Sequence, residues 1–404
     1  MGRLDLWVFG LFVVPMQRDM GWSRMEITGA VTLSLVCQGI AGPLLGPLMD
    51  RKQGSRWLMV GGGLLGGAAL VLAGKANSLA HLYLVYGVVL GVVGVTYGEL
   101  MSQVMVPKWF VRKRGRAVAL AALGYPMAAP TLVPAIQLVI AQWGWRSGFY
   151  ALGIATWVLV VPLAAWRMRR APEDMGLHPD GDPAPAAATV AGPTQRQPET
   201  SWPWRLAART PTLWLLVGAL GLATAAVSAI SVHRIPYLGD IGLSPAMAAA
   251  VITVSGTSAI VTKMGWGFLI ERLPVRFLLG GCFAALTAGV LIMLSISSTS
   301  MAFLWAVWWG GMVSGLVPLQ SVVFATYYGR GFLGGIRGRV QPPILLAQAL
   351  APLLPAFIHD ASDSYGLAFW VFFGAMGASA VLAFLARPPA HPKPTESPLP
   401  DLPT

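Results

Sequence analysis

The chain has 404 residues, of which 55% are hydrophobic and only 11% charged, with 47 glycines and 16 tryptophans. A soluble domain carries about 25% charged residues, so this chain has too few charges to cover a water-facing surface. Its two cysteines, Cys37 and Cys282, lie in apolar runs and exclude a secreted disulfide scaffold. The hydrophobic content excludes disorder for most of the chain. The composition therefore predicts a polytopic membrane protein.

The net charge of +12 does not indicate a nucleic-acid partner. Nucleic-acid binding needs basic residues gathered on one folded surface, with polar or aromatic side chains between them. Here the basic residues form short clusters between long apolar runs, as on the cytoplasmic side of a membrane protein. The expected surroundings are a lipid bilayer.

Apolar runs of about 20 residues, long enough to cross the hydrocarbon as a helix, predict twelve spans. They are 4–16, 27–49, 57–76, 80–105, 116–141, 147–168, 211–235, 246–269, 275–296, 300–326, 337–358 and 365–386. None alternates as a barrel strand would. The predicted fold class is an all-α membrane protein of two pseudo-symmetric six-helix halves.

The domain boundaries follow from one long polar stretch between the halves. We expect an N-terminal half over 1–170, a linker over 171–210, a C-terminal half over 211–387 and a disordered tail over 388–404. Prolines through the linker forbid a continuous helix there and favour an extended segment. With both termini inside, 22 of the 28 basic residues fall on the cytoplasmic side and four outside. This bias predicts the orientation.

The first span, Leu4 to Met16, is too short for the bilayer. Either it is a short, tilted anchor, or the sequence begins inside a longer helix, which would place Arg3 and Asp5 in the membrane. We favour the second interpretation, because the other eleven spans are full length. It predicts that upstream in-frame sequence encodes roughly 8–15 further apolar residues.

Two loops repeat the same order of residue types. Gly46-x-Leu48-x-Asp50-Arg51, with Arg56 after it, ends the second span. Gly267-x-Leu269-x-Glu271-Arg272 ends the eighth span 221 residues later. Such a match at equivalent positions indicates duplicated halves, as in many transporters. The alternative is a positive-inside loop with an incidental acid.

GPLMDRKQGSR (46–56) resembles the signature of the major facilitator superfamily between spans two and three. Further segments resemble its monocarboxylate transporter and oxalate:formate antiporter branch: MGWSR (20–24), WFVRKRGRA (109–117), GWR (144–146), RRAPEDMGLHPDG (169–181) and YGRGFLGGIRG (328–338). The resemblance implies alternating-access transport of a small organic anion, often coupled to protons by symport or antiport. It also implies that Asp50, Arg51, Arg56, Glu271 and Arg272 act as conformational latches in the outward-facing state.

Lys263 is the leading candidate for substrate binding. It lies inside span eight, where a lysine costs several kcal/mol unless it meets an anion or water. The monocarboxylate transporter branch that this chain resembles usually carries an arginine at this position, and that arginine is implicated in carboxylate binding. A lysine keeps the positive charge but cannot donate two parallel hydrogen bonds to a carboxylate as a guanidinium does. The alternative is snorkelling toward the headgroups.

Glu99 is the only acid deep in a span, at the depth of Lys263. A buried carboxyl tends to take up a proton, as a proton-coupled carrier requires. The equal alternative is a structural partner for a basic residue between Lys108 and Arg116. Tyr97 is a further candidate for the same cavity, although an interfacial aromatic explains it as well. Arg234, beside His233 at the outer end of span seven, is a weaker substrate candidate, because snorkelling explains it.

The sequence offers no motif that indicates an enzyme or a cofactor site. Gly61-x-Gly63-x-x-Gly66 matches the dinucleotide fingerprint but lies inside an apolar span, where it indicates helix packing. The five histidines, scattered singly, offer no metal spacing. We therefore expect a non-enzymatic carrier of a monocarboxylate or related organic acid, without cofactor or metal. A multidrug exporter of the same fold is the alternative, and a membrane receptor or scaffold is a third hypothesis from another class.

Overall fold

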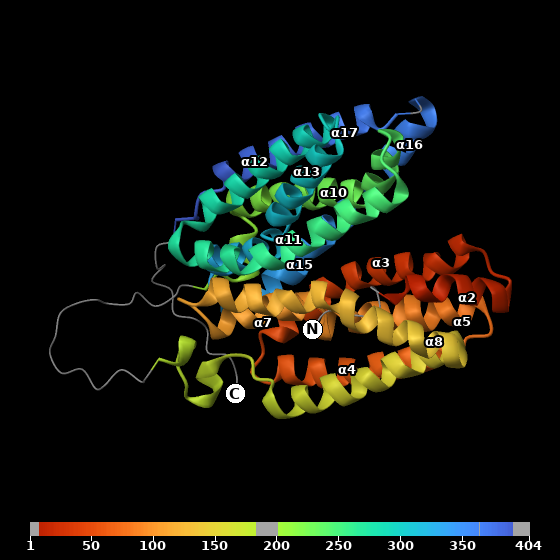
Figure 1. Ribbon diagram of the computed structural model, residues 1–404. Coiled ribbons are helices and arrows are strands. Elements are labelled where there is room, and N and C mark those ends of the chain that lie inside the picture. The colour runs from red at the N-terminus through yellow and green to blue at the C-terminus, as the bar shows by residue number, and fades with distance from the viewer. Residues whose placement is uncertain (1–7, 183–200, 363, 391–404) are drawn as a thin grey trace.

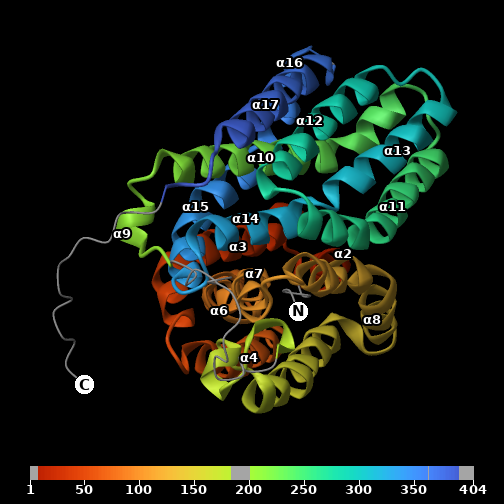
Figure 2. The same cartoon turned by 90° about the vertical axis from the view of Figure 1, so that its left-hand side faces the viewer.

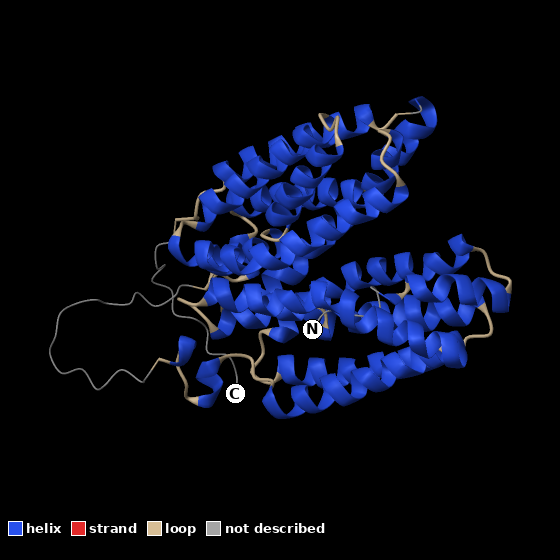
Figure 3. Cartoon of the chain, in the orientation of Figure 1, coloured by secondary structure: helices blue, strands red, loops and turns tan. Residues whose placement is uncertain are grey.

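The computed structural model describes residues 8–182, 201–362 and 364–390. Within these ranges the chain is built of helices and loops, without a strand (Figure 3). Ten helical segments there are long and apolar enough to cross a membrane. The predicted all-helical membrane fold is confirmed.

The N-terminal helices form the lower group in Figure 1. Their bounds are α2 (Gly10–Met20), α3 (Arg24–Met49), α4 (Gly54–Ala73), α5 (Leu79–Leu82), the π-helix η1 (Tyr83–Val89), α6 (Leu90–Tyr97), α7 (Glu99–Trp109) and α8 (Arg114–Arg167). Gly144, with φ of 78°, divides α8 into two arms. These arms are the predicted fifth and sixth spans.

The C-terminal helices form the upper group (Figure 1). They are α10 (Pro211–Asp240), α11 (Pro245–Arg272), α12 (Val275–Leu294), α13 (Thr299–Val313), α14 (Leu316–Tyr328), α15 (Leu333–Leu350), α16 (Leu353–Ser362) and α17 (Gly366–Leu385). Ser244 and Ser298 begin α11 and α13 by accepting hydrogen bonds from the backbone N–H groups of Met247 and Met301. Such caps satisfy amides that a helix start leaves unpaired.

Several predicted spans differ in detail from the structure. α2 extends to Met20, four residues beyond the predicted end of the first span, and residues 1–7, including Arg3 and Asp5, lie outside the described residues. Span four is interrupted at Gly98 and span ten at Ser314 and Gly315. Hydropathy does not detect these interruptions, because each break is only one or two residues long within a longer, predominantly apolar run.

The described part of the linker is more structured than expected. Residues after α8 form two short 3₁₀ helices, η2 (Pro172–Met175) and η3 (Pro179–Gly181), and α9 (Trp204–Ala207) precedes α10. The expectation of an extended segment is therefore wrong for 172–182. Proline at the first position of a helix is compatible with a short turn, even though it prevents a long helix.

The two groups of helices meet at the end where 168–182 and 201–210 lie, which we call the linker end. There α3 packs on α15 and α8 packs on α11. Gly46 approaches the backbone of Gly334, and Gly115 approaches that of Gly267, so closely that a Cβ would clash. Away from this end the two groups of ribbons diverge (Figure 1), and Figure 2 views the contact from the linker end.

Candidate functional site

Asp50 joins the two groups of helices at the linker end. It follows α3, and its carboxylate accepts hydrogen bonds from the backbone N–H groups of Gly334 (2.9 Å) and Gly335 (2.7 Å) at the start of α15. Lys108 of α7 donates to the same carboxylate at 2.6 Å, and both side chains are at least nine-tenths buried. A carboxylate here accepts hydrogen bonds from amides that have no partner within the helix. Its negative charge also interacts favourably with the positive end of the helix dipole.

Glu271 makes the corresponding contact in the other direction. It lies near the end of α11 and accepts from the backbone N–H of Arg116, the third residue of α8, at 3.0 Å. Its second oxygen lies 2.8 Å from Nε of Arg116. The duplicated loops therefore cap helices of opposite halves, so each acid holds the linker end closed.

The arginines of the predicted latches have different surroundings. Arg51, Arg56 and Arg272 make no ion pair among the described residues. Asp50 pairs with Lys108 and backbone amides, rather than with Arg51 or Arg56 of the predicted latch, and Arg170 donates to the Asp50 carbonyl oxygen. A free helix start offers several aligned donors, which explains why the acids face amides.

Glu99 begins α7 at the interruption of span four. Gly98 is extended (φ −83°, ψ −157°), so α6 and α7 do not form one continuous helix. The Glu99 side chain is solvent-exposed, although it lies deep along the span. Its carboxylate accepts a 2.6 Å hydrogen bond from Gln103, one turn along α7. Arg337 and Lys263 both act electrostatically on it, so it faces two cations of the other half.

Lys263 lies within α11 and is only 6% exposed. Its Nζ points to the carbonyl of Ala122 on α8, at 3.5 Å, and it interacts electrostatically with Glu99. The Lys263 side chain therefore does not extend toward the lipid headgroups. The charged residues that act on Glu99 are Arg337 and Lys263, and the loop from Lys108 to Arg116 is not among them.

Arg337 is the site residue that the sequence reasoning missed. It is completely buried in the second turn of α15, and its Nη2 donates to Oε1 of Gln103 across the two halves. Its Cζ lies 4.9 Å from the ring centroid of Phe324. The predicted span started at 337 and made it an interfacial charge, but α15 starts at Leu333. The glycines at 334, 335 and 338 were the available signal, because they indicate close helix packing around it.

Two further candidates do not join this cluster. Tyr97 is 5% exposed and packs against α4, where a Cβ on Gly66 would meet its hydroxyl. Arg234 lies six residues before the end of α10, half-buried, and its Nε has no hydrogen-bond partner among the described residues. The groups that act most strongly on Glu99 belong to Arg337, Gln103 and Lys263, rather than to these two side chains.

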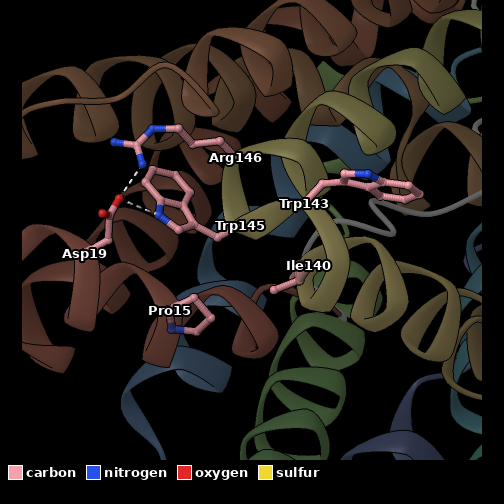
Figure 4. A pocket seen from close by; sticks show the side chains of 7 residues that line it. Pro15, Asp19, Ile140, Trp143, Trp145 and Arg146 are labelled. Carbon is pink, nitrogen blue, oxygen red and sulfur yellow. Dashed lines mark hydrogen bonds and ion pairs between the residues drawn. The ribbon is translucent and has the colours of Figure 1, made fainter.

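The N-terminal group has a hollow of about 350 Å³ that is lined by residues of α2 and by the bend of α8 at Gly144. Figure 4 shows this hollow from close by, with Asp19 of α2 and Trp145 and Arg146 of α8 labelled. Asp19 accepts a hydrogen bond from Nε1 of Trp145 (3.0 Å) and forms an ion pair with Arg146 (Figure 4). The guanidinium of Arg146 lies 4.3 Å from the Trp145 ring centroid. The GWR segment thus ties the bend to α2, and the hollow contains neither Lys263 nor Glu99.

The start of the linker docks on the loop after α7. The Asp180 carboxylate accepts from the backbone N–H groups of Val111, Arg112 and Lys113, at 2.9–3.1 Å. Burial acts to raise the pKa of Asp180, but these three donors outweigh it and hold the pKa below its ordinary value. Arg330, which follows α14, reaches Glu173 at 3.1 Å, so the linker contacts both halves.

Comparison with known proteins agrees with this architecture. The family model described as Major Facilitator Superfamily matches residues 1–336 and 235–403. Monocarboxylate transporter 3 of Rattus norvegicus is 28% identical over 86% of this chain and 64% of its own length. Monocarboxylate transporter 13 of the same organism is 25% identical over 90% of this chain and 80% of its own.

Solved structures share the fold at low sequence identity. The fucose:proton symporter FucP in its outward conformation superposes with a TM-score of 0.68 at 14% identity, over 95% of this chain and 96% of that one. The human organic anion transporter MFSD10 gives 0.63 at 16% identity, over 94% of both chains. The chain therefore belongs to the major facilitator superfamily, as a multi-pass secondary transporter, not an enzyme, related to monocarboxylate transporters.

Proposed function

We propose that this protein carries a small organic anion, a monocarboxylate or related organic acid, together with a proton by alternating access. The proposal rests on the electrostatic interaction of Lys263 with Glu99, which belong to opposite halves. Lys263 lies nine residues before the end of α11 and Glu99 ten before the end of α7, about 14–15 Å from the linker end in each case. Opposite charges therefore face each other at one depth.

Lys263 is the anion-binding group of this proposal. A nearly buried ammonium in a membrane span is stabilised by an anion, and its one hydrogen-bond acceptor among the described residues is a distant carbonyl. Glu99 is one carboxylate acting on two cations, Lys263 and Arg337, and a substrate carboxylate supplies the second negative charge. The names of the similar proteins, monocarboxylate and organic anion transporters, support this substrate class. The alternative, a multidrug exporter, would not need a buried cation such as Lys263 in its binding cavity.

Glu99 is the proton-binding group. Its side chain has accessible surface, whereas Lys263, which acts on it electrostatically, is buried, so Glu99 is the more open of the two to protonation. While Glu99 is ionised it competes with a substrate carboxylate for Lys263. Protonation removes this competitor, so proton binding favours anion binding and the pair crosses with less net charge. Tyr97 and Arg234 stay predictions as further contacts of the substrate.

We further propose that the linker end is cytoplasmic, with both termini inside, and that the structure is outward-facing. The distribution of basic residues supports the orientation. The closed linker end, with caps by Asp50 and Glu271, supports the state. The halves of this mechanism are 1–170 and 211–387, joined by the linker 171–210 and followed by the tail 388–404.

Uptake of labelled organic acids into proteoliposomes tests this function. A panel of mono- and dicarboxylates is measured with and without an inwardly directed proton gradient. We expect a monocarboxylate to accumulate only with the gradient, and Glu99→Gln to abolish accumulation while allowing exchange of substrate across the membrane. Equal uptake with and without the gradient in the wild type contradicts proton coupling. Uptake of lipophilic drugs without any carboxylate favours an exporter.

A further inference from the structure

The buried guanidinium of Arg337 is incompletely paired. It is 0% exposed, and neither Nε nor Nη1 has a hydrogen-bond partner among the described residues. Nη2 donates to Gln103, and the ring of Phe324 lies under the guanidinium. An amide oxygen and an aromatic face carry no full negative charge. A buried cation in a membrane protein needs an anion nearby or access to water.

The anion that serves Arg337 is Glu99. The charged groups that act on Glu99 are Arg337 of α15 and Lys263 of α11, and the polar side chain bonded to it is Gln103. Gln103 donates its amide N–H to Glu99 and accepts from Arg337 through its amide oxygen. A chain of polar contacts therefore runs from the N-terminal half to the C-terminal half, across the closed linker end.

This arrangement depends on the charge of Glu99. With an ionised carboxylate, the buried guanidinium has a counter-ion within the closed state. With a protonated carboxyl, Arg337 loses the negative charge that acts on it and stays buried with the Gln103 amide and the Phe324 ring, so the closed state becomes less favourable. Separation of the halves at the linker end would admit water to the guanidinium and relieve this cost.

We propose that Arg337 couples the proton on Glu99 to opening of the linker end, with Gln103 as the connection between them. The inference rests on the proposed function, because it takes Glu99 as the proton site. It adds a second cation whose role differs from that of the first, since Lys263 binds the transported anion, whereas Arg337 destabilises the closed state once Glu99 is neutral. Arg337 is thus a positioning residue that need not touch the substrate.

The effect of removing Arg337 on opening of the linker end distinguishes this coupling from a simple contact that holds the halves together. If Arg337 simply held the halves together through Gln103, its removal would open the linker end. In the proposed coupling, Arg337 is what makes a neutral Glu99 unfavourable. Its removal therefore keeps the linker end closed and makes it insensitive to pH.

Distances between two spin labels across the linker end test this without any substrate. Labels are placed at Lys52→Cys, in the loop after α3, and at Leu273→Cys, after α11, because both residues are exposed. The background carries Cys37→Ser and Cys282→Ser. Distances are measured between pH 8 and pH 5.5 for wild type, Glu99→Gln, Arg337→Gln, Arg337→Lys and the double variant Glu99→Gln/Arg337→Gln. Arg339→Gln, on the same helix, is the matched control for removing a cation.

We expect the wild-type ratio of open to closed forms to rise at least about tenfold on acidification, and Glu99→Gln to be open already at pH 8. Arg337→Gln and the double variant should stay closed at both pH values. Arg337→Lys and Arg339→Gln should keep the wild-type response. Opening of Arg337→Gln at pH 8, or an unchanged pH response in it, would overturn the coupling. The double variant keeps the test decisive if a single variant folds poorly.

The outcomes also separate this inference from the proposed function. Distances that respond to pH through Glu99 and Arg337, in a protein that transports no carboxylate, would support the coupling and contradict the substrate class. Proton-dependent carboxylate uptake that Arg337→Gln leaves fully pH-dependent would support the proposed function and contradict the coupling.

Discussion

Asp50 and Glu271, which are 221 residues apart in the chain, cap the starts of helices in opposite halves. Asp50 accepts from Gly334 and Gly335 of α15, and Glu271 accepts from Arg116 of α8. The two contacts differ in burial: Lys108, the ionic partner of Asp50, has 3% of its side chain exposed, whereas Arg116 has 42%. The duplicated loops are thus equivalent in geometry but unequal in energy.

Asp50→Asn should therefore open the linker end more than Glu271→Gln does. It leaves Lys108 buried without the carboxylate that is hydrogen-bonded to it, which costs about 3–5 kcal/mol for a buried pair, while the more exposed pair of Glu271 and Arg116 contributes at most about 1 kcal/mol. Alkylation of Met49→Cys, a buried site beside Gly334, measures the opening. Asp50→Asn/Lys108→Met should restore much of the protection, since no charge is left unpaired. Equal alkylation in Asp50→Asn and Glu271→Gln would contradict this ranking.

Gly46→Ala should destabilise the contact between α3 and α15. Its Cβ would meet the carbonyl of Gly334, and such overpacking costs about 1–3 kcal/mol. Gly61→Ala is the matched control, because it is a helical glycine with open space around it and alanine favours a helix by up to about 1 kcal/mol. Thermal unfolding in detergent compares the two. A lower midpoint for Gly61→Ala than for Gly46→Ala would show that helix contact is not the cause.

Docking of the linker start should weaken in acid. The pKa of Asp180 is lowered in the folded state, so its contribution is present above the ordinary aspartate value of about 3.9 and is lost as the pH falls through the lowered folded pKa. Amide hydrogen exchange of Val111, Arg112 and Lys113 reports the loss. Asp180→Ala should raise exchange there already at pH 7, by about 2 kcal/mol in opening free energy.

The matched control for Asp180 is Asp182→Ala. It removes an ionic partner of the exposed Arg112 side chain but leaves the acceptor of the three amides in place. We expect exchange of these amides in Asp182→Ala to stay close to that of the wild type. Unaltered exchange in Asp180→Ala would mean that the amides have other acceptors.

The positions of Lys263 and Glu99 could be predicted from the sequence, because each is a rare charged residue within an apolar span and its depth follows from the residue count. The side chains that contact them could not be predicted. Tyr97 is two residues from Glu99, about 200° around a helix, and the break at Gly98 further separates their directions. Arg337 was missed because hydropathy places a charge at a span's edge, whereas α15 begins four residues earlier. The docking of Asp180 depends on a left-handed residue (φ 62°), which a proline-rich pattern does not indicate.

If the ammonium of Lys263 binds the substrate's carboxylate, purified variants without this charge should bind the substrate more weakly. Affinity for the best transported carboxylate is measured by calorimetry for wild type, Lys263→Arg and Lys263→Gln in detergent. We predict that Lys263→Gln loses about 2–5 kcal/mol of binding free energy, at least about thirtyfold in Kd, while Lys263→Arg keeps most of the affinity because the charge remains. Wild-type affinity in a folded Lys263→Gln would contradict the account.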